Sequence, residues 1–168
     1  ELPGVSYEEL TYEGYGPGGV GIIIETATDN RNRTLPEVKL ALTKNGGSMA
    51  DAGSVMFQFD RKGVIRVATT GEDALLQVLD AGAEDAIEED DGLTVYTEMK
   101  ELSKVRQALV DAGLNVEDAE VQYVAKNTVP IDDVETARKV MKVLDALDDL
   151  DDVSNVHTNA DITVDIDD

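Results

Sequence analysis

The stretch Tyr12-Glu-Gly-Tyr-Gly-Pro-Gly-Gly19, followed directly by Val20-Gly-Ile-Ile-Ile-Glu25, decides how the first part of this chain folds. An unbroken run of β-branched side chains is typical of a strand that is buried on both faces, so residues 20–26 are predicted to form a central strand. Residues 6–13 are predicted to form a shorter strand before it. Glycines between two strands favour a β-hairpin connection, because glycine readily adopts the positive φ that tight turns require.

The glycine loop has two other interpretations, a dinucleotide-binding site and a contact loop. Gly14, Gly16 and Gly19 match the spacing of a dinucleotide-binding fingerprint. That fingerprint needs a helix after the glycines, because the helix N-terminus holds the pyrophosphate, whereas a strand follows here. The remaining interpretation is a loop that contacts a partner, with Tyr15 as a stacking surface.

A helix is predicted after the central strand. Thr34-Leu-Pro-Glu37 has the pattern of a capping box with proline in the first turn. Apolar residues at helical spacing follow, and Gly46-Gly47 is expected to end the helix. Val55, Phe57 and Phe59 then alternate with other residues, which predicts a strand with one buried face.

The pattern starts again at Gly63 and predicts the order βαββαβ for residues 63–126. Two segments within it are similar, Asp80-Ala-Gly-Ala-Glu-Asp-Ala86 and Asp111-Ala-Gly-Leu-Asn-Val-Glu-Asp-Ala119. Two similar βαβ halves are what a ferredoxin-like domain requires.

An amphipathic helix over residues 132–148 and a strand over residues 153–158 follow Pro130 without a neighbour in sequence to pack on. We therefore expect residues 127–168 to return to residues 1–62 and complete one discontinuous domain, with residues 63–126 inserted into it. The predicted fold class is α+β, with two ferredoxin-like α/β sandwich lobes, one inserted into the other.

Composition restricts the chemistry. The 168 residues include no cysteine, which excludes disulfides and thiolate metal sites and fits a reducing compartment. The formal net charge is −22, and residues 1–62 come nearest to neutrality, with six basic and nine acidic side chains. Because Lys and Arg bind phosphate backbones, any nucleic-acid contact is expected in this first third of the chain.

Asp29-Asn-Arg-Asn-Arg33 lies where the central strand ends and the next helix begins. Arg31 and Arg33, with nearby helix amides, are candidates to hold a phosphate. The alternative is a solvated loop in which the Asp and Asn side chains bond to turn amides. Arg61-Lys62 is a weaker candidate and is interpreted as a hairpin turn.

No catalytic set is indicated. His157 is the only histidine, and a single histidine on a strand is more often structural than catalytic. The acidic runs, such as Glu88-Glu-Asp-Asp91, lack the pattern of a calcium loop and are interpreted as solvated faces, with weak Mg²⁺ binding as the alternative. We expect no catalytic residue, no resident metal and no cofactor.

Five segments together resemble the YebC/PmpR family of transcriptional regulators, which includes the mitochondrial translational activator of cytochrome c oxidase. They occur in the family's order, and the resemblance runs from about Tyr12 to Ile162. The segments are Tyr12–Gly19, Asp29–Thr34, Lys44-Asn-Gly-Gly47, Gly53-Ser-Val55 and Phe59-x-x-Lys62-Gly63. The resemblance implies a two-lobed body, here without the family's N-terminal helical, basic domain; because the first residue is Glu1, we expect a processed chain or a fragment.

The resemblance implies a non-enzymatic gene-expression factor, either a DNA-binding transcriptional regulator or a ribosome-associated translation factor. We expect a cytoplasmic monomer that binds no membrane, and we expect this chain alone to bind duplex DNA weakly. The expected contacts with nucleic acid or the ribosome are Tyr15, Gly16, Pro17, Asn30, Arg31, Asn32 and Arg33. Two alternatives stay open: a ferredoxin-like module that binds a regulatory ligand, and an enzyme with a pocket of carboxylates whose pKa values are shifted.

Overall fold

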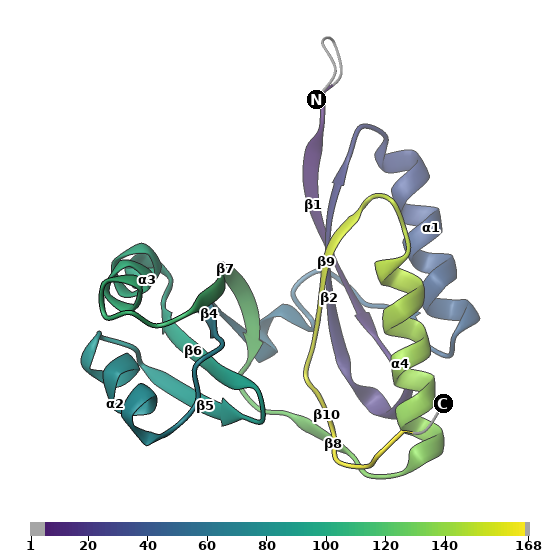
Figure 1. The fold of residues 1–168 in the computed structure, drawn as a ribbon. Helices are drawn as coiled ribbons and strands as arrows, with labels where there is room; N and C mark the ends of the chain where they lie inside the picture. The colour runs from purple at the N-terminus through teal and green to yellow at the C-terminus, as the bar shows by residue number, and fades with distance from the viewer. Residues whose placement is uncertain (1–5, 167–168) are drawn as a thin grey trace. The chain divides into compact units, whose positions relative to one another are not determined.

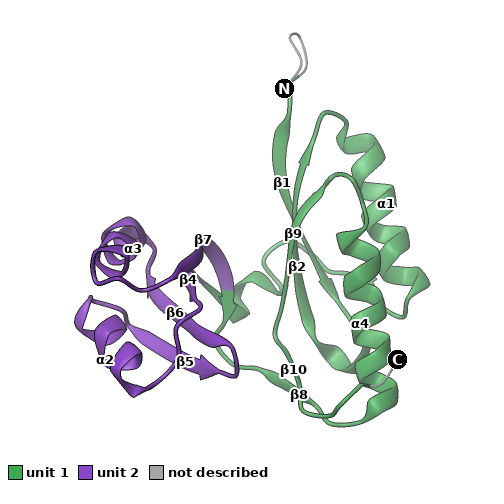
Figure 2. Cartoon of the chain, viewed as in Figure 1, with its two compact units in different colours: residues 1–60, 124–168 green, residues 61–123 purple. Residues whose placement is uncertain are grey.

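The structure is a computed structural model and describes residues 6–166. The chain divides into two compact units (Figure 2). Unit 1 comprises Glu1–Asp60 and Val124–Asp168, and unit 2 comprises Arg61–Tyr123. The division into a discontinuous domain of residues 1–62 with 127–168 and an inserted domain of residues 63–126 stays a prediction.

Unit 1 contains a four-stranded antiparallel sheet with two helices beside it (Figure 1). β1 and β2 form a hairpin in which Tyr15 lies opposite Gly21 at one end and Glu8 lies opposite Thr28 at the other. β9 pairs with the edge of β2 that faces away from β1, and β3 pairs with the last two residues of β1. The strands, in sheet order, are β3 (Ser48–Met49), β1 (Glu8–Tyr15), β2 (Gly21–Thr28) and β9 (Val153–Thr158).

β2 is the central strand that its apolar run predicted, because Ile22, Ile23 and Ile24 are all fully buried. Ile22 and Ile24 share a core with the apolar faces of α1 (Arg31–Lys44) and α4 (Val134–Asp148). Two short strands pair in parallel, β8 (Val129–Ile131) before α4 in the sequence and β10 (Ala160–Ile162) after it. The helix expected after Pro130 therefore packs on the central strand near the start of the chain.

Three local predictions were wrong. Arg61 and Lys62 form no hairpin turn, because they lie inside the strand β4 (Phe59–Val67). α1 begins at Arg31 rather than after Thr34, because the Asn30 side chain caps it and accepts a hydrogen bond from the Asn32 N–H at 3.1 Å. Residues 55–59 form no continuous strand: Met56–Gln58 is a 3₁₀ turn, and Phe57 is 66% exposed. The strand β4 begins only at Phe59.

Unit 2 has the predicted element order βαββαβ. Its sheet has the order β5-β6-β4-β7, in which the first and third strands of the unit are central, as in a ferredoxin-like domain. Ile65, Leu93 and Leu109 are fully buried in its separate core. The elements are β4 (Phe59–Val67), α2 (Glu72–Asp80), β5 (Asp85–Glu89), β6 (Gly92–Glu98), α3 (Leu102–Asp111) and β7 (Val116–Ala125). The α+β class is confirmed.

Candidate nucleic-acid interface

The predicted contact residues lie at opposite ends of the β1–β2 hairpin. Tyr15, Gly16 and Pro17 are at the turn, where Tyr15 faces Gly21. Asn30, Arg31, Asn32 and Arg33 follow Thr28, which faces Glu8 at the open end. Strand residues advance by about 3.3 Å each, so seven steps along β1 separate the two ends by roughly 23 Å. The two groups therefore do not form one site.

At the open end, both arginines are already engaged by carboxylates. Arg31 donates from Nε and Nη2 to the two oxygens of Glu8, each at 3.0 Å. Arg33 donates from Nε and Nη2 to Asp152 at 3.1 and 2.9 Å, and also to Asp29 at 2.9 Å. A phosphate at this end would have to displace at least one carboxylate.

Asp152 ties the start of α1 to the turn that follows α4. Its carboxylate also accepts a hydrogen bond from Thr34 Oγ1 at 2.7 Å, and its carbonyl accepts from the Ala27 N–H at 2.9 Å. The bonds from Arg33 and then Thr34 lower the pKa of Asp152, against the opposing effect of burial. The bond to Asp152 in turn raises the pKa of Arg33. This geometry is that of a structural ion pair, and the phosphate contact at Asn30–Arg33 stays a prediction.

At the turn, the backbone follows a compact path. Pro17–Gly19 forms a 3₁₀ turn, which the Gly16 N–H closes with a 2.8 Å bond to the Val20 carbonyl. Gly18 and Gly19 have φ values of 78° and 82°, which other residues rarely adopt. The loop is therefore a hairpin connection with a defined shape.

The turn lies between the end of α1 and the start of α4. Gly47, just after α1, approaches the Tyr15 carbonyl so closely that a Cβ atom there would lie 2.5 Å from the oxygen. A Cβ atom on Gly18 would lie 2.9 Å from Ile131 and 3.1 Å from Thr136 in the first turn of α4. The Cβ position of Gly46, two residues after Lys44, lies 3.6 Å from Pro17, so the turn is close to the last of the basic residues on α1.

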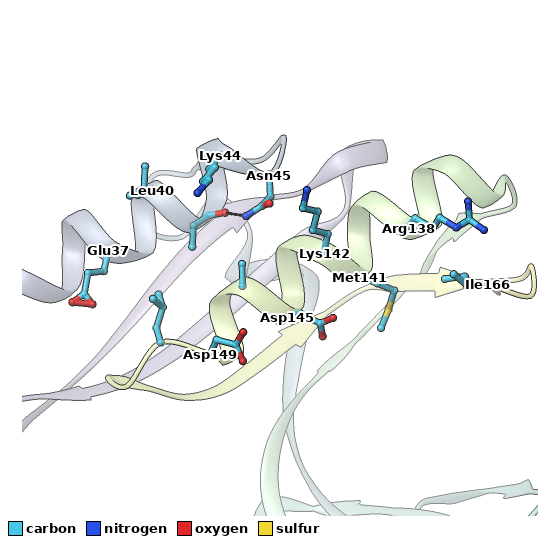
Figure 3. Close-up of a pocket in the computed structure, with 13 residues that line it drawn as sticks. Glu37, Leu40, Lys44, Asn45, Arg138, Met141, Lys142, Asp145, Asp149 and Ile166 are labelled. Carbon is cyan, nitrogen blue, oxygen red and sulfur yellow. Dashed lines mark hydrogen bonds between the residues drawn. The ribbon is translucent and has the colours of Figure 1, made fainter. Parts of the chain in front are cut away.

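Three basic residues line a groove of about 780 Å³ between α1 and α4 (Figure 3). Lys44 is the last residue of α1, and Arg138 and Lys142 are one helical turn apart on α4. Lys44 and Lys142 form no ion pair with any residue in the range 6–166. Figure 3 shows these three toward one part of the groove and the carboxylates of Glu37, Asp145 and Asp149 toward another. We call Tyr15, Pro17, Lys44, Arg138 and Lys142 the loop-end surface; Gly16, which was also predicted as a contact, is buried.

The sequence analysis missed Lys44, Arg138 and Lys142 as candidates. Lys44 is far from the other two along the chain, so only the tertiary fold brings them to one groove. The available signal was the i, i+4 spacing of Arg138 and Lys142 on a helix that was predicted to pack on the strand over residues 20–26.

The opposite face of the unit 1 sheet holds two buried polar groups. Glu13 lies opposite Ile23, which lies opposite His157, so the three residues share one row on this face. His157 Nε2 lies 2.6 Å from a carboxylate oxygen of Glu25 on the neighbouring strand, a contact that fits the structural role expected of this histidine. No group of His, Cys, Asp or Glu in the described part of the chain could hold a metal ion.

Glu13 holds the loop before β4. Its carboxylate is 4% exposed and accepts hydrogen bonds from the N–H groups of Gly53, Val55 and Met56 at 2.6, 2.8 and 2.7 Å. Burial raises the pKa of Glu13, but the three amide donors together outweigh it, so its pKa is lower than usual. Sequence reasoning did not identify this residue.

Comparison with known proteins decides the family. A family model that describes the second and third domain of TACO1/YebC proteins matches residues 7–160. The chain belongs to the TACO1/YebC family. This confirms the resemblance seen in the loop and helix motifs.

Bacterial relatives match almost the whole chain. A protein of Thermobifida fusca is 51% identical over 169 residues, covering 99% of this chain and 68% of its own length. One of Moorella thermoacetica is 47% identical, covering 100% of this chain and 69% of its own length. Both are named as probable transcriptional regulatory proteins.

A solved structure agrees with the fold. The crystal structure of a conserved hypothetical protein from Aquifex aeolicus superposes with a TM-score of 0.93 at 41% identity, covering 99% of this chain and 70% of that one. None of the helices that residues 6–166 form is long and apolar enough to cross a membrane.

Proposed function

We propose that this protein is a non-enzymatic regulator of gene expression that acts by contacting nucleic acid. The observation that carries the proposal is the match of nearly the whole chain, at about half identity, to proteins named as probable transcriptional regulators. The buried polar groups of unit 1 support a binding role, because Glu13, Asp152 and His157 bond to neighbouring strands, loops and helices.

The loop-end surface is the contact surface that the geometry favours. Phosphate contacts come from Lys and Arg side chains that are exposed and can exchange a counterion for a phosphate. Lys44 and Lys142 meet this condition, whereas Arg31 and Arg33 are held by carboxylates. The partly exposed ring of Tyr15 provides a surface on which a base can stack.

Charge favours RNA, including the RNA of a ribosome, over duplex DNA as the partner. The chain carries 36 acidic and 14 basic side chains, so its field repels an extended duplex. Lys44 and Lys142, which form no ion pair among residues 6–166, can neutralise only about two phosphates, which suits a local contact to an unpaired segment. In family members that carry the basic helical domain, that domain would supply the larger electrostatic attraction.

Ultraviolet cross-linking in cells tests this proposal. The protein as the cell makes it would be cross-linked and purified, and the attached nucleic acid would be sequenced. We expect RNA to be recovered with the wild type and with a Lys39→Glu control, whose side chain is exposed on α1 outside the groove. We expect the recovery to fall at least about tenfold for Lys44→Glu combined with Lys142→Glu, because opposed charges repel phosphates.

Two outcomes would contradict the proposal. Recovery of no nucleic acid above the background of an unrelated acidic protein would remove the binding role itself. Equal recovery with the double variant and the wild type would place the contact elsewhere. Arg31→Ala then tests the nucleic-acid contact that was predicted at Asn30–Arg33. This substitution removes a cation whose only described ion pair, with Glu8, is exposed to solvent.

A further inference from the structure

We propose that the outer edge of β1 binds an extended basic segment of a partner protein, which adds to the sheet of unit 1 as another strand. On this side of β1, only Gly14 and Tyr15 pair with β3. No other strand formed by residues 6–166 lies on that side, so the edge is open over residues 8–12. On its inner side, β1 pairs with β2 along its entire length (Figure 1).

The backbone of this edge presents unpaired groups outward. The Ala50 N–H donates to the Glu13 carbonyl at 2.9 Å, so the peptide groups of Glu13 face the outer side. In an antiparallel strand the N–H and C=O of one residue point the same way, and successive residues alternate. Thr11 and Glu9 therefore each offer a donor and an acceptor at the open edge. Such a row is a template for strand addition.

A pocket of about 440 Å³ lies beside this edge. It is lined by Leu10 and Tyr12 of β1 and by Arg31, Asn32, Leu35 and Pro36 of the first turns of α1. Leu35 is 45% exposed, so part of the lining is apolar surface in contact with solvent. Because side chains alternate along a strand, every second residue of an added segment would point toward this pocket. An apolar side chain fits there.

The charges along the edge identify the occupant. Glu9 is exposed there, on the face of β1 away from the pocket, and the chain as a whole has a net charge of −22. A segment in which Lys or Arg alternates with apolar residues would place a cation beside Glu9 while its apolar side chains fill the pocket. The same charges oppose a second copy of this chain, because antiparallel pairing of two β1 edges would bring Glu9 near acidic side chains of the other copy.

A synthetic probe tests this surface directly. The probe is a fluorescently labelled nine-residue peptide in which Val alternates with Lys, titrated with the whole chain and followed by anisotropy. We expect saturable binding with a dissociation constant of about 100 μM or tighter. Replacing every Val by Ser, which keeps the charge, should weaken binding at least about tenfold if the pocket is used.

Substitutions at one position separate strand addition from general charge attraction. Thr11→Pro removes an outward N–H without touching the bonds to β2, and proline is tolerated on an edge strand in that orientation. We expect Thr11→Pro to weaken binding at least about tenfold and Thr11→Val to leave it unchanged. Glu9→Lys should also weaken binding, whereas Asp80→Lys, at the end of α2, should not.

Hydrogen exchange on the wild-type chain gives a readout that does not depend on how the variants fold. The amides of Glu9 and Thr11 should become protected when the peptide binds. Peptide binding without this protection, or binding that a folded Thr11→Pro variant retains, would overturn the proposal. A dimer in sedimentation that Thr11→Pro dissociates would show that a second copy is the occupant, which would overturn the assignment of the partner.

Discussion

Glu13 shows how one buried carboxylate fixes a loop distant in sequence. Its two oxygens receive three backbone N–H groups from residues 53–56, which have no strand partner of their own. The carboxylate thereby compensates for groups that would otherwise be buried without acceptors. This side chain therefore stabilises the loop before β4, together with the loop's own bonds such as that from the Ser54 N–H to the Asp51 carbonyl.

Glu13→Gln should therefore destabilise the protein. The substituted amide has one oxygen and a nitrogen that can only donate, so at least one loop N–H loses its acceptor. We expect the free energy of unfolding to fall by about 2 kcal/mol, within the range for a lost charge-assisted bond. Urea denaturation measures this. Glu9→Gln, on the exposed face of the same strand, is the matched control and should change stability by less than about 0.5 kcal/mol.

The pH dependence follows from the lowered pKa values of Glu13 and Asp152. A group whose pKa is lower in the folded state contributes stability above its unfolded pKa, near 4 for these residues, and loses it as the pH falls through the folded value. The stability difference between the wild type and a Glu13→Gln, Asp152→Asn double variant should therefore be constant from pH 7 to about 5. It should shrink as the pH falls below about 4. A difference that stays constant down to pH 3 would show that the two carboxylates titrate normally.

At the scale of helices and strands, long segments with a regular apolar pattern could be predicted from sequence. The residues at which α1 and β4 begin could not. The apolar run of residues 20–26 and the amphipathic pattern of residues 132–148 correspond to β2 and α4, which share one core. The capping box at Thr34 failed because Asn30 caps the helix instead, and Thr34 Oγ1 bonds to Asp152, 118 residues away. The strand expected at Val55 failed because Glu13 holds the Val55 and Met56 amides. In the second case a distant side chain overrode a local pattern.

The candidate site could likewise be predicted from sequence only in part. The hairpin turn at Tyr15–Pro17 was predictable from its glycines, and the length of the hairpin already separated it from Arg31 and Arg33. The engagement of those arginines by Glu8 and Asp152 was not predictable, since neither acid is near in sequence. Lys142 joins Lys44 only because α4 packs beside α1.

Substitutions on α4 test whether this helix stabilises unit 1 through the shared core. Leu147 is fully buried there, and Leu147→Ala should lower the free energy of unfolding by about 2–5 kcal/mol through lost burial and a cavity. Met141, on the same helix and 39% exposed, should cost less than about 1.5 kcal/mol when changed to Ala. Urea denaturation followed by amide exchange of β2 measures both. Equal losses for the two variants would mean that α4 contributes little core packing.

At the scale of the whole molecule, net charge dominates interactions with nucleic acid. Acidic side chains exceed basic ones by 22, and several of the basic ones are held in ion pairs such as Arg66 with Glu89 and Lys62 with Glu84. We expect this chain to bind duplex DNA no more tightly than about 10 μM at 150 mM salt, with a salt slope of about 2 or less. An anisotropy titration measures both quantities. Sub-micromolar duplex binding would show that the acidic surface does not limit the contact.

The central claim is that the loop-end surface carries the regulatory function, and complementation of a gene deletion tests it most directly. Wild type, Arg31→Ala and Lys44→Glu with Lys142→Glu would be expressed at equal levels, and transcript abundance and ribosome occupancy would be measured across the genome. We predict that the first two restore the normal profile and that the folded double variant does not, with the failure seen in ribosome occupancy. Full restoration by the double variant would contradict the account.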